Sequence, residues 1–187
     1  MRIISGKHKS KRLVAPKKLP VRPTTDFAKE ALFNVLNNHY YLDELTVIDL
    51  FSGTGNISYE LASRGCTDIT AVDSHPGCVQ FISKTSQELD MNIKTVRSDV
   101  FKFLERTLLK VDLIFADPPY DMPEEDMLKI PQIAFDRALL LPGGMLVVEH
   151  SKHTDLSKDP HFSDSRRYGG SVFSFFENPE EEEDTEA

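Results

Sequence analysis

The stretch Thr46-Val47-Ile48-Asp49-Leu50-Phe51-Ser52-Gly53-Thr54-Gly55-Asn56 joins a short apolar segment to a turn that holds two glycines. Its first six residues predict a buried strand. Gly53 and Gly55 allow a tight turn and a close approach of a ligand to the backbone. The helix predicted over 56–64 then presents free N–H groups at its start. Asp49, within the strand, faces the same cleft and can bind a cation. Ser58 replaces the third glycine of the dinucleotide fingerprint, and Gly-x-Gly alone also fits a plain strand-to-helix turn.

Downstream, strand-like apolar runs alternate with segments of helical periodicity, and Gly169-Gly170 predicts a hairpin. Strands that alternate with helices favour parallel pairing through crossover connections. We therefore expect an α/β fold with a doubly wound, Rossmann-like sheet of seven strands, mostly parallel with an antiparallel terminal hairpin, plus a small N-terminal β-hairpin and helix extension. The further strands are predicted at 68–72, 93–97, 111–116, 144–149, 162–168 and 171–177, and the further helices at 27–36, 76–91, 100–109 and 124–141.

The length of 187 residues suits one globular domain with a small appendage. No apolar run approaches the roughly 20 residues that span a bilayer, and the N-terminus lacks the apolar segment of a signal peptide. The two cysteines, Cys66 and Cys78, provide neither a disulfide framework nor a metal-binding set. We therefore expect a soluble cytoplasmic protein with no metal and no membrane partner.

Charge is distributed unevenly along the chain, whose net charge is −8. Residues 1–30 hold nine Lys and Arg against two acids, whereas residues 177–187 hold seven acids and no base. We expect a basic hairpin extension over 1–21, a main domain over 22–177 and a disordered acidic tail over 178–187. A basic arm on an acidic protein favours a polyanion partner, although such a run can also be a solvated face.

Two further acids follow predicted strands. Asp73 ends the second strand, where a carboxylate can accept both hydroxyls of a ribose. Asp99 follows the third strand, within reach of an adenine amine. Asp99 could instead cap the next helix, and Asp73 could be a surface loop acid. With Asp49, these acids converge on one crevice, which favours a cofactor that contains a nucleoside.

The tetrapeptide Asp117-Pro118-Pro119-Tyr120 follows the fourth predicted strand. Two prolines fix φ twice and remove two N–H donors, so the segment is a stiff corner rather than helix or strand interior. The Asp117 carboxylate and a backbone carbonyl are acceptors beside an aromatic face. This corner suits a flat substrate that carries an NH2 group, although an ordinary Pro-Pro turn with an exposed tyrosine is the alternative.

These ordered motifs resemble those of class I S-adenosylmethionine-dependent methyltransferases, and the Asp-Pro-Pro-Tyr form resembles enzymes that methylate a planar nitrogen. The segments 1–6 (Met-Arg-Ile-Ile-Ser-Gly), 22–26 (Arg-Pro-Thr-Thr-Asp) and 30–36 (Glu-Ala-Leu-Phe-Asn-Val-Leu) resemble the RsmD family of bacterial 16S rRNA guanine-N2 methyltransferases. The likeness covers nearly the whole chain except the acidic tail. Members of the family commonly have Ala where this chain has Ser52, and Glu where it has Asp73. The segment 151–165 matches no family pattern.

The resemblance implies S-adenosylmethionine as cofactor and 16S rRNA, either free or within an assembling small subunit, as partner, with no protein partner expected. Asp117, Pro118, Pro119 and Tyr120 are the implied catalytic residues: Asp117 and the Pro118 carbonyl accept N–H bonds from the amine, and Tyr120 stacks on the base. Cofactor contacts are implied for Asp49, Phe51, Ser52, Gly53, Thr54, Gly55, Asp73, Ser74, Asp99, Val100 and Asp117. RNA contacts are expected from Lys7, Lys9, Lys11, Arg12, Arg22, Thr24 and Thr25.

Three alternatives remain at this point. A DNA adenine or cytosine amino-methyltransferase shares the motif, but 187 residues leave little room for a sequence-reading domain. A protein glutamine methyltransferase usually has Asn where Asp117 stands. A catalytically idle RNA-binding scaffold is disfavoured because the cofactor and Asp-Pro-Pro-Tyr motifs are both retained. Arg22, Thr24 and Thr25 close the pocket or contact RNA in one interpretation and simply cap a helix in the other.

Overall fold

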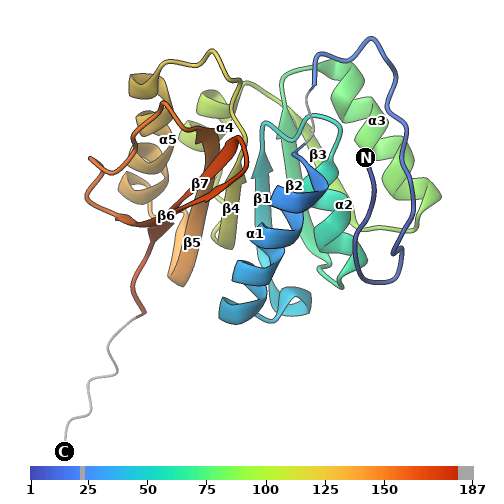
Figure 1. Ribbon diagram of the computed structural model, residues 1–187, viewed down its shortest axis with the longest axis horizontal. Helices are drawn as coiled ribbons and strands as arrows, with labels where there is room; N and C mark the ends of the chain where they lie inside the picture. The colour runs from blue at the N-terminus through green and yellow to red at the C-terminus, as the bar shows by residue number, and fades with distance from the viewer. Residues whose placement is uncertain (22–23, 181–187) are drawn as a thin grey trace, which may run out of the picture.

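Seven strands form one sheet in the order β3-β2-β1-β4-β5-β7-β6, in a computed structural model that describes residues 1–21 and 24–180 (Figure 1). The first five strands in this order are parallel, and β7 pairs antiparallel with both β5 and β6. The predicted fold class is therefore confirmed. The strands are β1 (Thr46–Leu50), β2 (Asp68–Asp73), β3 (Ile93–Arg97), β4 (Val111–Ala116), β5 (Leu140–Ser151), β6 (Phe162–Tyr168) and β7 (Ser171–Glu177).

Helices cover both faces of the sheet, as a doubly wound fold requires. α1 (Asp26–His39), α2 (Asn56–Ser63) and α3 (Pro76–Glu88) share one apolar core with the sheet. α4 (Val100–Arg106) and α5 (Glu124–Asp136) share a second core on the opposite face (Figure 1). A short 3-10 helix, Leu42–Glu44, precedes β1. Parallel strands place their carboxyl ends at one edge of the sheet, where open α/β folds bind ligands.

Residues 1–21 contain the predicted basic hairpin. Its two arms are joined by one antiparallel bridge, Arg2 with Arg12, and by a hydrogen bond from the Leu13 N–H to the Met1 carbonyl, at 2.9 Å. Ile3 and Leu13 are buried in the α1–α3 core, so the hairpin packs as part of the main body. Gly6 lies against α2: a Cβ there would stand 1.8 Å from the Ser63 carbonyl oxygen. Only glycine fits this approach.

Sequence reasoning was wrong where it extended the last helix to residue 141. α5 ends at Asp136, and β5 begins at Leu140. Ala138 has a φ of +49°, which the right-handed helix does not accommodate. The apolar residues 139–141 continued the helical spacing and therefore concealed this break. The helices predicted over 76–91 and 100–109 also end early, at Glu88 and Arg106.

The C-terminal residues that the structure describes are attached to the sheet. The Asn178 side-chain amide donates to the carbonyls of Leu140 and Leu141, at 3.1 and 3.0 Å. The predicted tail thus begins with a residue held by β5, and its remainder, 181–187, lies outside the described residues. Over the described chain, none of the helices is long and apolar enough to span a bilayer.

Candidate active site

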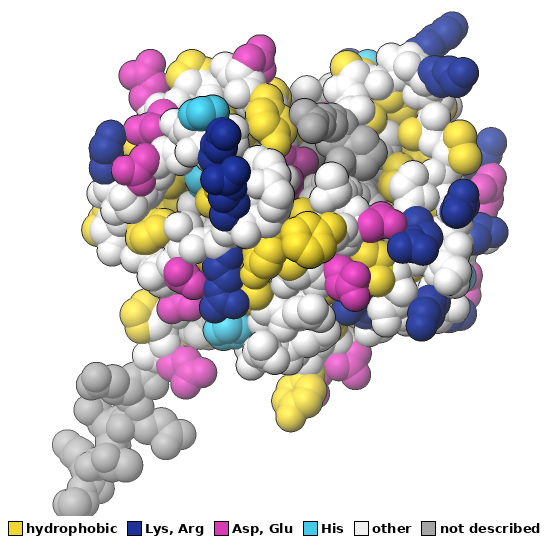
Figure 2. All heavy atoms as spheres, in the orientation of Figure 1, with side chains coloured by type: hydrophobic (Ala, Val, Ile, Leu, Met, Phe, Trp, Pro, Cys, Tyr) yellow, Lys and Arg dark blue, Asp and Glu magenta, His cyan; other side chains and the backbone are white. Residues whose placement is uncertain are grey.

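A cavity of about 820 Å³ opens at the carboxyl edge of the parallel strands. Figure 2 shows this hollow near the middle of one face, with an acidic side chain visible inside it. The lining residues come from the ends of β1, β2, β4 and β5, from the segment before α1 and from the β6–β7 turn. Sequence reasoning expected thirteen of them as site residues: Thr24, Thr25, Asp49, Phe51, Ser52, Gly53, Thr54, Asp73, Ser74 and the four residues of the corner 117–120.

The turn after β1 has an unusual backbone. Phe51, Gly53 and Gly55 all have positive φ values, of +53°, +55° and +88°. A Cβ at Gly55 would lie 2.9 Å from atoms of the Ile82 and Tyr59 side chains, so this position accepts only glycine. A positive φ at a phenylalanine is strained, and such strain clusters at functional sites. The turn therefore presents a ligand-facing backbone rather than a generic connection.

Asp49 lies beneath this turn and is 1% exposed. Its Oδ2 atom accepts a hydrogen bond of 2.6 Å from the Ser58 hydroxyl. Burial raises the pKa of Asp49 to about 7, although the Ser58 hydrogen bond opposes that shift. Ser58, which replaces the third glycine of the dinucleotide fingerprint, thus positions a buried acid. A bound cation would favour the ionised form of Asp49.

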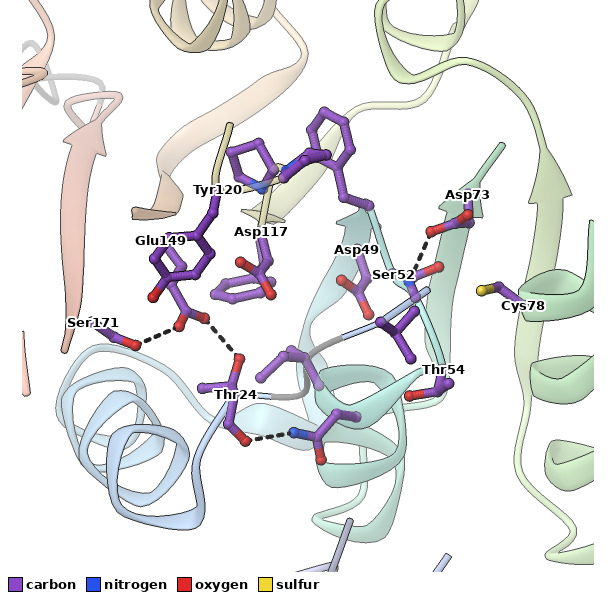
Figure 3. A pocket seen from close by; sticks show the side chains of 18 of the residues that line it. Thr24, Asp49, Ser52, Thr54, Asp73, Cys78, Asp117, Tyr120, Glu149 and Ser171 are labelled. Carbon is purple, nitrogen blue, oxygen red and sulfur yellow. Dashed lines mark hydrogen bonds between the residues drawn. The ribbon is translucent and has the colours of Figure 1, made fainter. Parts of the chain in front are cut away.

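Asp73 connects the end of β2 to the glycine turn (Figure 3). Its two carboxylate oxygens accept 2.8 Å hydrogen bonds from the backbone N–H groups of Gly53 and His75. This carboxylate lines the cavity and fixes the turn at the same time. A carboxylate has about four lone-pair directions, so these two bonds leave capacity for a ligand hydroxyl.

The corner 117–120 leaves β4 at the other side of the cavity. Burial, and then the charges of Glu149 and Asp49, raise the pKa of Asp117 well above its usual range. Within the corner, Pro118 is buried, whereas Tyr120 is 52% exposed and lines the cavity. The arrangement combines a half-buried acid that is prone to protonation with an accessible aromatic ring.

Glu149, at the end of β5, is a cavity residue that sequence reasoning missed. It is 3% exposed, and its oxygens accept 2.7 Å hydrogen bonds from the hydroxyls of Thr24 and Ser171 (Figure 3). An acid at the end of a predicted parallel strand was the available signal, as for Asp73. The hydroxyl donors come from distant segments, and sequence spacing does not reveal them.

Thr25 has the capping role that was considered for it, and the RNA contact of Thr24 and Thr25 stays a prediction. The Thr25 hydroxyl caps α1 by accepting from the Ala28 N–H at 3.2 Å. Thr24 holds Glu149 and, through its carbonyl, accepts a 3.1 Å bond from the Asn56 side chain. Both threonines line the cavity. Arg22, predicted beside them, lies outside the described residues.

Several predicted site residues lie elsewhere. Asp99 caps α4 by accepting from the Lys102 N–H at 3.0 Å, and neither Asp99 nor Val100 lines the cavity. Gly55 shapes the turn after β1 but does not line the cavity. The predicted RNA-binding side chains of the hairpin are exposed and lie outside the cavity: Lys7, Lys9, Lys11 and Arg12. Arg12 lines a second, smaller cavity of about 290 Å³ with Met1, Arg2 and Asp26.

Aromatic residues that sequence reasoning did not predict complete the cavity. Phe27 of α1 is 65% exposed and meets Tyr168 edge to face, with ring centroids 6.1 Å apart. Phe27 fits the apolar spacing of α1, and the sequence alone therefore did not indicate that its side chain is exposed. The other lining residues that sequence reasoning did not single out as site residues are Pro20, Val21, Asn56, Ile57, His75, Cys78, Phe115, Gly169, Gly170 and Ser171.

The cavity is acidic. Asp49, Asp73, Asp117 and Glu149 line it, and the described lining includes no Lys or Arg. Carboxylates that are buried together disfavour ionisation until a positive charge or a set of N–H donors enters. Among residues 1–21 and 24–180, no three His, Cys, Asp or Glu side chains are placed to hold a metal ion. The cavity thus matches a cationic organic ligand and an N–H donor.

The sheet order and the ligand edge define the fold of class I S-adenosylmethionine-dependent methyltransferases. The solved structure of the putative methyltransferase yhhF from Escherichia coli has a TM-score of 0.80 at 24% identity, covering 96% of this chain and 98% of that one. Thermus thermophilus RsmC, a 16S rRNA N2 methyltransferase solved with AdoMet and guanosine, has a TM-score of 0.69 at 20% identity, covering 86% and 45%.

The model of the family "Conserved hypothetical protein 95" matches residues 1–177, so this chain belongs to that family, which is the RsmD family indicated by the motifs. "Putative rRNA methyltransferase YlbH" of Bacillus subtilis is 30% identical over 161 residues, covering 83% of this chain and 85% of its own. "Ribosomal RNA small subunit methyltransferase D" of Buchnera aphidicola is 31% identical over 121 residues, or 64% of this chain. That match spans 61% of the relative's length.

Proposed function

We propose that this protein is an S-adenosylmethionine-dependent methyltransferase that methylates the exocyclic N2 amine of a guanine in 16S rRNA. The observation that supports it most is the pairing of Asp117 and Tyr120 on one stiff corner of an acid-lined cavity in a member of this family. The corner provides an acceptor for an amine and a ring for a base. Named relatives act on small-subunit rRNA, which supports the choice of polymer.

The cofactor half of the site is the strained turn after β1 together with Asp49 and Asp73. S-adenosylmethionine supplies an activated methyl group on a positively charged sulfonium. The acidic lining, without a described Lys or Arg, fits such a cation. Asp73 can accept ribose hydroxyls, because its two backbone hydrogen bonds leave lone pairs available. The glycines let the backbone approach the ligand, and Asp99 is the proposed partner of the adenine amine.

The acceptor half is formed by residues 117–120. Asp117 and the Pro118 carbonyl would hold the amine N–H groups, which would leave the out-of-plane lone pair of N2 open to a methyl donor. As the N–C bond forms, positive charge develops on N2, and the Asp117 carboxylate stabilises it. The raised pKa of Asp117 lets this group accept the departing N–H proton. Tyr120 stacks on the base, which must be unpaired or flipped to reach it.

The proposed binding of RNA rests on the basic hairpin, residues 1–21. Its seven Lys and Arg residues, with no acid among them, can hold phosphates outside the acidic cavity. Thr24 and Thr25, which line the cavity, and Arg22 are the further RNA contacts of this proposal. We also propose that the main domain extends from residue 22 to residue 177. The natural substrate in this proposal is a small ribosomal subunit in assembly, and the protein acts in the cytoplasm.

Reconstitution with purified protein tests the proposal. Unmethylated 16S rRNA, supplied free and as a reconstituted small subunit, is incubated with S-adenosylmethionine and digested to nucleosides for mass spectrometry. We expect N2-methylguanosine from at least one of the two substrates, and none from genomic DNA supplied at the same concentration. Methylated adenine or cytosine in the DNA sample, or no methylated nucleoside in either rRNA sample, would contradict the assignment.

A further inference from the structure

Phe27 of α1 is an exposed aromatic side chain at the cavity that the proposed chemistry does not use. Of the six large hydrophobic side chains that are well exposed in the described chain, two line the cavity: Phe27, at 65%, and Tyr120, at 52%. The buried face of α1 is formed by other residues, among them Leu32 and Phe33. Single exposed hydrophobic residues are ordinary on a surface, but one that lines a ligand cavity indicates contact with the ligand.

Tyr168 places a second ring beside Phe27. It lines the cavity from the end of β6, and the two rings meet edge to face, with centroids 6.1 Å apart. Such a pair covers at most one face of either ring, so a face of Phe27 stays clear of Tyr168. Gly169 and Gly170 follow along the cavity wall, and a Cβ at either would have no described atom within 4 Å beyond its chain neighbours. The two rings therefore border open space.

A basic residue shares this face of β6. Arg166 is exposed and lies two positions before Tyr168, so both side chains point to the same side of the strand. Its guanidinium is 5.9 Å from the centroid of the Phe175 ring, and its Nε donates to Asp164 at 3.0 Å. Figure 2 shows hydrophobic side chains below the hollow with a Lys or Arg side chain beside them. Aromatic rings next to a guanidinium favour a nucleotide over a purely apolar partner.

A flipped target base leaves its neighbours in the strand without a stacking partner. In the proposed function the target guanine enters the corner 117–120, with Tyr120 as its own stacking ring. When that base leaves the strand, each adjacent base loses one of its stacked neighbours. Proteins that hold single-stranded nucleic acid supply aromatic rings on which successive bases stack. Phe27 provides such a ring on the same cavity.

We propose that Phe27, supported by Tyr168, stacks on a base next to the methylated guanine and so holds the opened strand at the cavity. This inference rests on the proposed function and adds the residue that positions the strand. Phe27 acts in binding and positioning, because it does not touch the reacting amine. The contact requires a base beside the target and accepts any of the four, since every base has a face that can stack.

A double-mutant cycle between protein and RNA tests this contact. In unmethylated 16S rRNA, the nucleotide upstream or downstream of the mapped target guanine is replaced by an abasic residue. The kcat/KM of wild-type protein and of Phe27→Ala is measured on each RNA, in the form, free or assembled, that wild-type protein methylates. We expect one abasic replacement to lower the wild-type value about fivefold to 150-fold, and Phe27→Ala to lower it similarly on intact RNA. On that abasic RNA, Phe27→Ala should cause no further loss, because both changes remove the same stack.

Three further variants keep the outcomes distinct. Phe27→Trp retains a ring and should keep the wild-type sensitivity to the abasic residue, whereas Phe27→Leu should lose that sensitivity. Phe27→Leu also decides the question if Phe27→Ala is inactive on every RNA. Tyr41→Ala removes a ring that is 79% exposed and does not line the cavity, and it should leave kcat/KM as in wild type.

Two results would overturn the inference and leave the proposed function intact. One is a wild-type kcat/KM for Phe27→Ala on intact RNA. The other is a set of losses from Phe27→Ala and from either abasic residue that multiply independently, which would mean that Phe27 does not contact a neighbouring base. No methylation of guanine by wild-type protein removes both the inference and the proposed function.

Discussion

The cavity and the basic hairpin are opposites in charge and exposure. The cavity is lined by four acids and no described Lys or Arg, and two of these acids, Asp49 and Glu149, are buried. The hairpin, residues 1–21, holds seven Lys and Arg and no acid, and Lys7, Lys9, Lys11 and Arg12 are all exposed. A cation and a base suit the first region, and phosphates suit the second. The difference indicates that an RNA substrate inserts one base while its backbone stays outside.

A buried ion pair nevertheless joins the two regions. Lys29 and Glu60 are both fully buried, with Nζ and Oε2 3.2 Å apart. Glu60 also accepts the backbone N–H groups of Ile4 and Ser5 in the hairpin. Lys29 donates to the Asn56 side chain, at 2.8 Å, in the cavity wall. Burial lowers the pKa of Lys29, and Glu60 opposes that shift.

The largest effect is expected from Asp117→Ala in the cavity. This change removes the amine acceptor, and methyl transfer should fall by about a hundredfold to a thousandfold or more. Cofactor affinity should persist, because the turn after β1 is untouched. Single-turnover assays together with calorimetry with S-adenosylmethionine measure the two quantities. Normal transfer by Asp117→Ala would remove this residue from the mechanism.

The junction between the regions is the next target. Glu60→Gln leaves Lys29 buried without its counter-ion, and the free energy of unfolding should fall by about 3–5 kcal/mol. Glu88→Gln is the matched control, because its ion pair with Lys84 is exposed on α3. That change should cost less than about 1 kcal/mol. Urea unfolding measures both, and equal losses would show that the buried pair has no special role.

Neutralising the hairpin should separate RNA binding from chemistry. Replacing Lys7, Lys9, Lys11 and Arg12 with Ala should weaken RNA affinity and reduce its logarithmic salt slope by about 0.7–0.9 for each lost phosphate contact. Lys110→Ala with Lys129→Ala, on the α4–α5 side, is the control. Filter binding across a salt series measures the slope. If the slope stayed at the wild-type value, the RNA surface would have to lie elsewhere.

The smallest effect concerns pH and the cavity alone. Asp49 has a pKa of about 7 in the folded protein without ligand, above the unfolded value of about 3.9. The folded state therefore retains a proton that the unfolded chain releases, so stability falls as pH rises from about 4 through 7. A cation favours ionised Asp49, so cofactor affinity should rise up to about tenfold per pH unit below 7 and then level off. Calorimetry across pH tests this, and Asp49→Asn should weaken the dependence.

Sequence patterns located the strands and the cofactor turn, because alternating buried runs and paired glycines are local signals. They failed at residue 138, where a positive φ ends α5 within an apolar run. They also missed Glu149 as a site residue, because its hydroxyl partners arrive from before α1 and from β7. Asp99 shows the opposite limit: one position fits both a helix cap, which the structure shows, and a contact with the cofactor, which stays a proposal.

Deleting the gene and mapping N2-methylguanosine in small-subunit rRNA by mass spectrometry tests the central claim most directly. The account predicts the loss of one N2-methylguanosine, restored by the wild-type gene and not by the gene for Asp117→Ala. An unchanged set of N2-methylguanosines in the deletion strain would contradict it.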